Sequence, residues 1–482
     1  MFAPPACAIH ALREISARCV VDSFERLRAA DCPWLLDSVL RVPELGRFSF
    51  AGADPYLLLR ARGERVEIEC RRAVYPALVP GHHVFAAPAL EAIRQLLFVP
   101  GPTSPPVPFA GGAVGYLGYE LAAQFDAHVL CAPDDLGLPD ALFLFVDAVL
   151  AFDHEESRAY AIGIGYGDTV RDAGRRAEVA ADRIEELLRG AAPISHSRRR
   201  FAATKPAPDP EPEAHAKAVD IVKQEIAAGN VYQACLTHRI ERAFGGDAWQ
   251  LYRALRRINP APFACFLDLP EICIVGSSPE RFLKATPDGA VESRPIKGTR
   301  PRGRDAEADR AYRRDLAESV KDRAENLMIV DLVRNDLGRI CETGSVHVPD
   351  LMRVEPYASV FQMVSTVRGR LRPGCDVLDL VRATFPPGSM TGAPKIAAMR
   401  LLDRLESVRR GIYAGAIGYL DARGSADLSV VIRTLFLRDG IAYLHAGGGI
   451  VADSQPEQEY AEALDKLRPL LAALEDCAGS RG

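Results

Sequence analysis

The chain has 482 residues, of which 48% are hydrophobic and 26% are charged. This composition is typical of a globular protein with two or three domains or one large fused unit, and it excludes a collagen, a coiled rod and a disordered chain. Its 59 basic and 64 acidic side chains give a formal net charge of -5, so no basic excess is available for binding nucleic acid.

The first region, residues 1–190, has the pattern of many short strands and few helices. Runs of β-branched and aromatic residues between Gly and Pro predict the strands, and an amphipathic pattern predicts a helix over 168–188. The clearest strand patterns cover residues 57–59, 66–68, 114–119 and 142–151.

Residues 191–212 have the composition of an exposed linker. The run Ser195-His-Ser-Arg-Arg-Arg200 is followed by Lys205-Pro-Ala-Pro-Asp-Pro-Glu-Pro212, which can bury little and has proline at alternate positions. We therefore expect an N-terminal region at 1–190, a linker at 191–212 and a second, motif-rich domain at 213–475.

The second domain mixes long helical patterns with strand patterns. Its first helix, over 213–228, ends at the stop signal Gly229-Asn230. Strands are predicted at 231–240, 264–267, 272–277, 412–420, 430–437 and 441–445, and helices at 306–339, 376–384, 394–405 and 456–474, the last kinked or restarted at Pro469. Without regular βαβ alternation, this order favours an α+β fold with large antiparallel β-sheets packed face to face and outer helices over a parallel barrel.

Membrane and export signals are not found. The longest apolar stretch, residues 141–152, contains Asp147 and is shorter than the roughly 20 residues of a membrane helix. No basic segment precedes the apolar start of the chain. Eleven cysteines without a Cys-x-x-Cys pair indicate buried thiols rather than disulfides or zinc ligands. We expect a cytoplasmic protein.

The last predicted helix carries a candidate cation site. Glu459, Glu462 and Lys466 fall on one face, and two carboxylates a turn apart suit a hard cation. The glycines at 447–449 just before the helix would let backbone amides approach an anion. A solvated charged face is the alternative interpretation.

Three further residues are candidates for chemistry. Glu325 lies beside four apolar residues, so its carboxylate needs a metal, a proton or an arginine partner. Glu280, where a strand leads into a loop, suits a general acid whose pKa is raised by partial burial; a pair with Arg281 or another basic residue is the alternative.

Lys297 is one of only eight lysines among the 59 basic residues. It can lose its proton, which arginine cannot, and a neutral amine is a nucleophile. Lowering its pKa from about 10.4 towards 7 costs about 4 to 5 kcal/mol. A surface lysine that binds an anion is the alternative.

Five motifs in order resemble the signatures of the chorismate-utilising enzymes. They are Ser277-Ser-Pro-Glu-Arg-Phe282, Pro295-Ile-Lys-Gly-Thr-Arg-Pro-Arg302, Glu325-Asn-Leu-Met-Ile-Val-Asp-Leu332, Ser389-Met-Thr-Gly-Ala-Pro-Lys395 and Ala446-Gly-Gly-Gly-Ile-Val-Ala-Asp-Ser454. The resemblance implies a four-layer α/β/β/α fold and a chorismate substrate. It is dense over 213–475 and thin before the linker, at 33–38 and 46–50.

The resemblance also implies the roles of individual residues. Glu325 and Glu462 would be Mg²⁺ ligands, with Glu459 at or just beyond the coordination sphere. The residues implied to surround the substrate are Thr391, Tyr413, Arg433, Gly447, Gly448, Gly449, Lys466 and Gln233.

Two positions point to one branch of the family, the aminodeoxychorismate synthases. Relatives that add water carry a lysine base where this chain has Gln233, which cannot deprotonate water. Anthranilate synthases usually have alanine at the position of Lys297. In the implied reaction Lys297 attacks C2 of chorismate, Glu280 protonates the leaving C4 hydroxyl, and ammonia then displaces the lysine at C4.

The implied ammonia source is a separate glutamine amidotransferase subunit, since no glutaminase-like Cys-His-Glu constellation is recognisable. Anthranilate synthase component I remains the alternative activity, and a non-catalytic binding paralogue is the alternative from another class. Gln362 stands where anthranilate synthases have histidine. Residues 35–38 resemble their tryptophan-binding element only partly, so feedback inhibition is not inferred.

Overall fold

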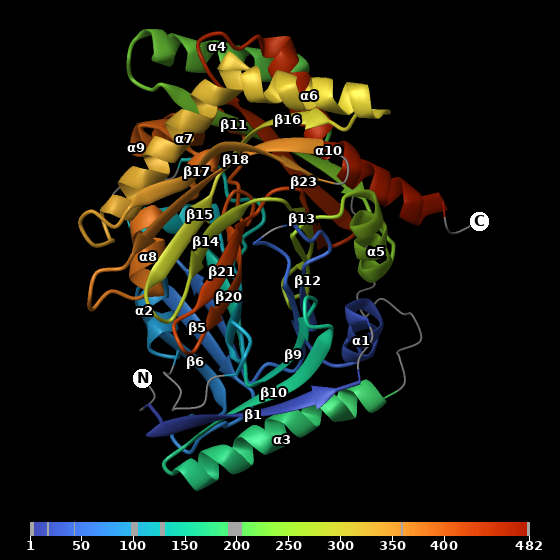
Figure 1. Cartoon of the computed structure of the whole chain (residues 1–482), viewed down its shortest axis with the longest axis vertical. Helices are drawn as coiled ribbons and strands as arrows, with labels where there is room; N and C mark the ends of the chain where they lie inside the picture. Colours follow the sequence, from blue (N-terminus) through green and yellow to red (C-terminus); the bar gives the residue numbers. More distant parts are fainter. Residues whose placement is uncertain are drawn as a thin grey trace.

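The computed structural model of the chain describes residues 4–16, 19–42, 44–97, 105–125, 131–190, 205–357 and 360–479. Their strands form two large antiparallel sheets that enclose the main core, and helices lie on the outer sides (Figure 1). The predicted α+β fold with large antiparallel sheets and outer helices is therefore confirmed.

In the described part of the chain, the first sheet has eleven strands. Its order is β1 (Cys7–Ile15), β10 (Arg158–Gly167), β9 (Ala148–Asp153), β3 (Phe48–Gly52), β2 (Trp34–Asp37), β12 (Phe263–Asp268), β13 (Cys273–Ser278), β22 (Thr434–Arg438), β23 (Ile441–Ile450), β11 (Gln233–Ala243) and β19 (Gly392–Ala393). The N-terminal and C-terminal strands meet inside the sheet, where Leu36 of β2 lies opposite Cys265 of β12.

The second sheet is built in the same way from both parts of the chain. Its order is β16 (Ile296–Pro301), β18 (Val360–Arg370), β15 (Ala290–Arg294), β14 (Arg281–Ala285), β21 (Ala426–Val430), β20 (Ala416–Asp421), β7 (Gly112–Leu117), β8 (Ala141–Val146), β4 (Leu57–Arg62), β5 (Arg65–Cys70) and β6 (Gly81–Ala86), with β17 (His347–Pro356) paired to β18. Here the two parts meet at β7 and β20, with Gly115 opposite Gly418.

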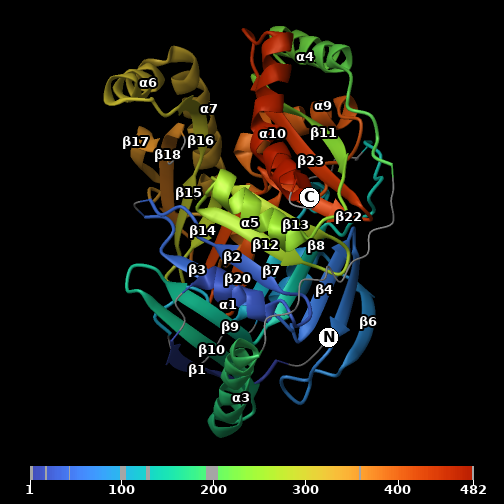
Figure 2. The same ribbon diagram turned by 90° about the vertical axis from the view of Figure 1, so that its right-hand side faces the viewer.

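The helices cover the outer faces of the sheets. Four of them follow one another along the first sheet in Figure 2: α10 (Pro456–Gly479), α5 (Ala248–Ile258), α1 (Val20–Leu27) and α3 (Val170–Arg189). Near β11 and the edge strand β19 lie α4 (Pro212–Ala227) and α9 (Lys395–Leu405), whereas α2 (Ala89–Arg94), α6 (Ala306–Glu318), α7 (Val320–Gly338) and α8 (Val377–Thr384) pack on the side of the second sheet. Two short 3₁₀ turns are η1 (Tyr119–Gln124) and η2 (Gly388–Met390).

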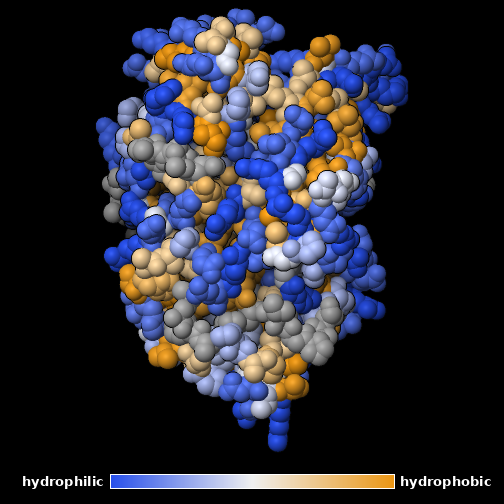
Figure 3. Space-filling view, turned by 90° about the vertical axis from the view of Figure 1, so that its left-hand side faces the viewer, coloured by the Kyte–Doolittle hydropathy of each residue, from blue (hydrophilic) through white to orange (hydrophobic). Residues whose placement is uncertain are grey.

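Apolar burial explains this arrangement. The main core between the sheets takes Leu58, Phe145, Trp34 and Tyr419 from strands of both regions, and a second core under α1, α5 and α10 contains Trp249. On the face drawn in Figure 3, hydrophobic residues form separate patches among hydrophilic ones. Within the described residues, no helix combines the length and apolar character needed to cross a bilayer.

Both sheets combine strands from the two predicted regions, so strands of one region form backbone hydrogen bonds with strands of the other. Residues 191–204 of the predicted linker lie outside the described residues, and the described remainder leads into α4. The division at 191–212 stays a prediction.

Two predicted strands are wrong because the chain changes sheet within them. The pattern over 142–151 is two strands, β8 and β9, separated by Asp147, whose carboxylate pairs with Arg72 at 2.7 Å and Arg183 at 2.6 Å. The pattern over 430–437 ends β21 at Val430 and resumes in β22, and Arg433 between them has φ 53°. Apolar periodicity marks burial but not the sheet in which a strand lies.

The predicted helix over 306–339 is two helices. Ser319 ends α6 and begins α7, where its hydroxyl accepts a hydrogen bond from the Asp322 amide at 3.3 Å, as an N-cap serine does. The last helix, in contrast, continues through Pro469. The strands from β14 to β18 were not predicted individually, apart from the motifs that they contain.

Candidate active site

A cavity of about 440 Å³ gathers most of the predicted site residues. Its walls come from β11, β16, β18, β23, α7, η2 and α10, and from the crossing between β21 and β22. The predicted residues that line it are Glu280, Lys297, Glu325, Tyr413, Arg433, Gly447, Gly448, Gly449, Glu459, Glu462 and Lys466. Thr391 and Gln233 are not among its lining residues.

Lys297 reaches the cavity from β16. The next residue, Gly298, has φ 82°, and a Cβ there would lie 2.9 Å from the Cβ of Asp322 on α7. A glycine is therefore needed for the strand to approach the helix this closely. Among the described residues, none accepts a hydrogen bond or forms an ion pair with the Lys297 ammonium group, so the amine is available to a ligand.

Glu280 lies between β13 and β14 and is 5% exposed. Burial raises the pKa of its carboxyl to about 7, and the Ser389 hydroxyl and Lys297 partly oppose that rise. Arg281 is directed elsewhere, because it binds Asp427 at 2.9 Å and Glu292 at 2.7 Å. The alternative interpretation of Glu280 as the partner of Arg281 is thus excluded, and its carboxyl can hold or release a proton near neutral pH.

Three carboxylates lie at the α7 and α10 side of the cavity. A Cβ at Gly448 would be 3.0 Å from Glu459 Oε2 and 3.7 Å from Glu462 Oε1, so both carboxylates converge beside this glycine. Burial, with the like charges of Asp322 and Glu462, raises the pKa of Glu325 against the opposing effect of Lys297 and Lys321. Oxygen donors around a buried negative charge suit a hard cation.

Two of the carboxylates also have partners within the protein. Glu459 accepts a hydrogen bond from the Ser454 hydroxyl at 2.7 Å, and Glu462 pairs with Lys466 at 2.7 Å. Burial opposes ionisation of Glu462, but Lys466 lowers its pKa overall. Within the described residues, no three His, Cys, Asp or Glu side chains form a group close enough to hold a metal ion as they stand.

Cationic groups occupy the neighbouring wall. Burial lowers the pKa of Arg433, and no carboxylate of the described residues forms an ion pair with it. Its guanidinium donates to the Lys466 carbonyl at 3.0 Å, and Lys466 Nζ donates to the Gly447 carbonyl at 2.7 Å. A half-buried arginine that forms no ion pair within the described residues favours an anionic ligand.

Thr391 and Gln233 support the wall from behind. The Thr391 carbonyl accepts a hydrogen bond from the Cys235 amide at 2.8 Å. Gln233 is 1% exposed, and its Nε2 lies only 2.0 Å from where a Cβ on Gly449 would be. Gly449 is thus a glycine because the glutamine amide fills the space beside it, whereas its predicted role was contact with an anion.

Several lining residues had no predicted role. His445 stacks on Tyr413 with ring centroids 4.6 Å apart, and burial lowers its pKa well below the ordinary value. Ser389 lies beside Glu280, and the buried Oε1 of Gln362 has no hydrogen-bond partner in the part of the chain that the structure describes. Ser389 stands in one of the sequence motifs, which was the only signal for it. Its contact with Glu280 could not be predicted, because the two residues are far apart in sequence.

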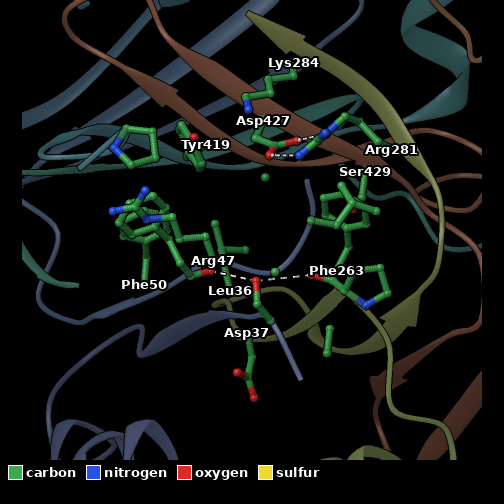
Figure 4. Close-up of a pocket in the computed structure, with 18 of the residues that line it drawn as sticks. Leu36, Asp37, Arg47, Phe50, Phe263, Arg281, Lys284, Tyr419, Asp427 and Ser429 are labelled. Atoms are coloured by element: carbon green, nitrogen blue, oxygen red, sulfur yellow. Dashed lines mark hydrogen bonds and ion pairs between the residues drawn. The ribbon is translucent and has the colours of Figure 1, made fainter. Parts of the chain in front are cut away.

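A second cavity, of about 500 Å³, lies between the sheets near β2, β3, β14 and β20 (Figure 4). Leu36 and Ser38 of the sequence element 35–38 line it. The Asp37 carboxylate points away, to the Tyr252 hydroxyl and Arg256, both at 2.8 Å. This cavity holds none of the predicted catalytic residues.

Comparisons with known proteins identify the family of the chain. A family model described as chorismate binding enzyme matches residues 45–472. An aminodeoxychorismate synthase of Streptomyces griseus is 45% identical over 457 residues, covering 94% of this chain and 62% of that protein. Aminodeoxychorismate synthase component 1 of Salmonella typhimurium is 39% identical over 446 residues, with 92% and 94% covered.

A solved structure supports the fold. Anthranilate synthase component I from Streptococcus pneumoniae TIGR4 has a TM-score of 0.75 and 32% identity, covering 89% of this chain and 93% of that chain. This chain thus spans less than two thirds of the Streptomyces griseus protein and nearly all of the Salmonella and Streptococcus proteins.

Proposed function

The chain belongs to the chorismate binding enzymes, and we propose that within this family it is an aminodeoxychorismate synthase component 1. In this proposal it converts chorismate and ammonia into 4-amino-4-deoxychorismate. The names of its relatives from Streptomyces griseus and Salmonella typhimurium support the assignment.

One observation carries the proposal. Lys297 and Glu280 line the same cavity; the lysine has no hydrogen-bond or ion-pair partner among the described residues, and burial raises the pKa of the carboxyl to about 7. A nucleophilic amine and a proton donor are the two groups that displacement of a hydroxyl requires. The uncompensated Arg433 beside them suits a substrate that carries carboxylates.

In the first step neutral Lys297 Nζ forms a bond to C2 of chorismate. The ring double bonds shift, and the C4 hydroxyl leaves as water with the proton of Glu280. Arg433 and Lys466 would hold the carboxylates of the substrate during this step. Burial of Glu280 matters because a carboxyl that is already ionised has no proton to give.

In the second step ammonia forms a bond to C4 and Lys297 leaves C2 as a neutral amine. The Glu280 carboxylate takes one proton from the new ammonium group, which restores the acid. Two displacements give retention at C4. Gln233 cannot deprotonate water, so no group at that position favours addition of water over ammonia.

Mg²⁺ is part of the proposal, with Glu325, Glu459 and Glu462 as its binding residues. The donor chemistry fits, since all three side chains offer carboxylate oxygens and two converge beside Gly448. When bound, Mg²⁺ would neutralise these carboxylates and hold a substrate carboxylate.

A glutamine amidotransferase subunit is the proposed source of ammonia, and the cytoplasm is the proposed location. The name of the Salmonella relative, a component 1, supports the existence of a partner.

The identity of the compound formed from chorismate and ammonium tests the proposed function. We expect that the purified protein with chorismate, ammonium and Mg²⁺ releases a compound that aminodeoxychorismate lyase converts into para-aminobenzoate. Formation of anthranilate instead would support the second candidate, anthranilate synthase component I, which is favoured by the likeness to the Streptococcus pneumoniae structure. A folded protein that forms neither product would support the non-catalytic alternative.

A further inference from the structure

The loop from Thr384 to Lys395, which joins α8 to α9, forms one wall of the candidate active site. It carries Ser389 and Met390 in η2 to the 440 Å³ cavity. Its later part forms β19, which pairs with β11. The roles described so far do not use Lys395.

The side chain of Lys395 closes this loop. Its Nζ donates hydrogen bonds to the carbonyls of Thr384 at 2.6 Å and Pro386 at 2.9 Å, and to Asp336 Oδ2 at 2.7 Å. The residue is 8% exposed, so these acceptors replace water around all three donors. Because Thr384 and Pro386 begin the loop and Lys395 ends it, the bonds fix both ends together against α7.

The tip of the loop meets the proposed general acid. Ser389 is 7% exposed and lines, with Glu280, both the large cavity and a small one of about 20 Å³. Its hydroxyl faces the Glu280 carboxyl across these shared walls, and this polar neighbour favours the ionised form, which opposes the rise in pKa caused by burial. The other groups that face this carboxyl are Lys297 from β16 and Tyr357, which follows β17.

We propose that Lys395 is a positioning residue for the general acid, because by closing the loop against α7 it holds the Ser389 hydroxyl against Glu280. The proposal rests on the function proposed above for Glu280. Arg410 Nη1 also holds the loop, through the Met390 carbonyl at 2.6 Å, so the alternative is that Arg410 alone fixes Ser389.

The test measures the pKa of Glu280 in the full chain. A protonated-carboxyl infrared band that disappears in Glu280→Gln is titrated with pH, and the same pKa is sought in the pH profile of kcat with ammonia. Ser389→Ala removes a polar neighbour that favours the ionised form, so we expect the pKa of Glu280 to rise by about one unit. The paired replacement of Lys395→Met with Asp336→Leu leaves no unpaired buried charge and should give the same rise.

Combining the variants distinguishes a positioning role of Lys395 from a general loss of structure. If Lys395 acts by positioning Ser389, the paired replacement already removes the effect of the serine. Adding Ser389→Ala then raises the pKa of Glu280 no further than the paired replacement alone. Lys395→Arg, which keeps the charge but not three converging donors, should keep the fold and give part of the rise. The control Ser429→Ala removes another buried hydroxyl, bound to the Ile417 carbonyl at 3.2 Å, and should leave the pKa unchanged.

An unchanged pKa in both Lys395 variants, or a full additional rise on combination, would overturn the role of Lys395. Lower kcat with an unchanged pKa would likewise reduce it to a merely structural residue. The infrared titration needs no turnover, so unaltered protein that forms no aminodeoxychorismate would count against the proposed function alone.

Discussion

At the scale of residues, Glu280 and Arg281 are adjacent in sequence but differ in whether they have charged partners. Arg281 has two carboxylate partners, whereas Glu280 has no cation in ion-pair contact among the described residues. Neighbouring residues in extended backbone point to opposite sides. Arg281 lines the 500 Å³ cavity, and Glu280 lines the 440 Å³ cavity of the candidate active site.

Lys297→Ala tests the nucleophile. We expect loss of most aminodeoxychorismate formation, because the variant has no amine to form the covalent intermediate, while chorismate binding is largely kept. Product chromatography and calorimetric titration with chorismate measure the two effects. Lys284→Ala, which removes a lysine lining the second cavity, is the matched control. Full activity of Lys297→Ala would remove the covalent role.

Glu325→Gln tests the proposed metal ligand. The amide keeps the shape but loses the charge, so we expect tight chorismate binding to lose its requirement for Mg²⁺. Calorimetric titrations with and without Mg²⁺ check this, with Glu318→Gln at the exposed end of α6 as the control. Unchanged metal dependence in Glu325→Gln would argue against this ligand.

The sequence singled out Lys297 and Glu280 through local signals, a rare lysine and a carboxyl at a strand end, and both line one cavity. It was insufficient for Ser389 and for the reason behind Gly449. Each depends on a residue that the fold brings close, Glu280 in the first case and Gln233 in the second. The roles of all these residues remain to be tested by the variants.

At the scale of elements, the cavity forms where the chain passes between sheets. Residues 431–433 join β21 in the second sheet to β22 in the first, and Arg433 projects from this crossing into the cavity. The apolar pattern on both sides predicted one continuous strand. The crossing could not be predicted, since burial on both faces gives the same signal in either sheet.

A second element-scale feature joins α4, β11 and α10. His215, His238 and Tyr460 pack with ring centroids 5.2 to 5.5 Å apart. Burial lowers the pKa of both histidines, that of His238 to about 4, with His215 adding to the effect and Asp209 opposing it. Within the described residues neither nitrogen of His238 has a hydrogen-bond partner, so this environment favours the neutral ring.

His238→Phe tests this contact by its pH dependence. Since the folded pKa lies below the unfolded value of about 6.5, the unfolded state binds more protons, and stability is lost as pH falls from 6.5 towards 4. We expect the unaltered protein to lose on the order of 3 kcal/mol more than His238→Phe between pH 7 and pH 4. Urea unfolding followed by circular dichroism measures it.

The matched control is His82→Phe at a side chain that is 58% exposed. It should keep the pH dependence of the unaltered protein. Equal loss of stability in the unaltered protein and in His238→Phe would contradict the interpretation.

At the scale of the whole molecule, each sheet joins strands from before and after the predicted linker. The pairs β2 with β12 and β7 with β20 are internal to the sheets. The sequence predicted the α+β class because strand and helix patterns alternate irregularly. It did not predict this pairing, since period-two patterns carry no information on which distant strand is the neighbour.

Fragments test this interdependence. Residues 205–482 produced alone would keep β12 paired to β13 and β20 paired to β21, but each would lose its neighbour on the other side, β2 or β7, exposing a sheet edge and apolar surface. We expect no cooperative thermal unfolding by circular dichroism, and recovery of a folded complex when residues 1–190 are co-expressed. Cooperative unfolding of the fragment alone would show that the predicted second domain is independent.

The pairing of β2 with β12 also matters during synthesis. A ribosome adds about 5–20 residues per second, so at least about ten seconds pass between the emergence of β2 and that of its neighbour. Throughout this interval the nascent chain presents an unfinished sheet edge to the other proteins of the cell. The need of the nascent chain for chaperones should therefore depend on the order in which β2 and β12 are translated. Slowing translation between them should increase aggregation, although the folded protein is the same.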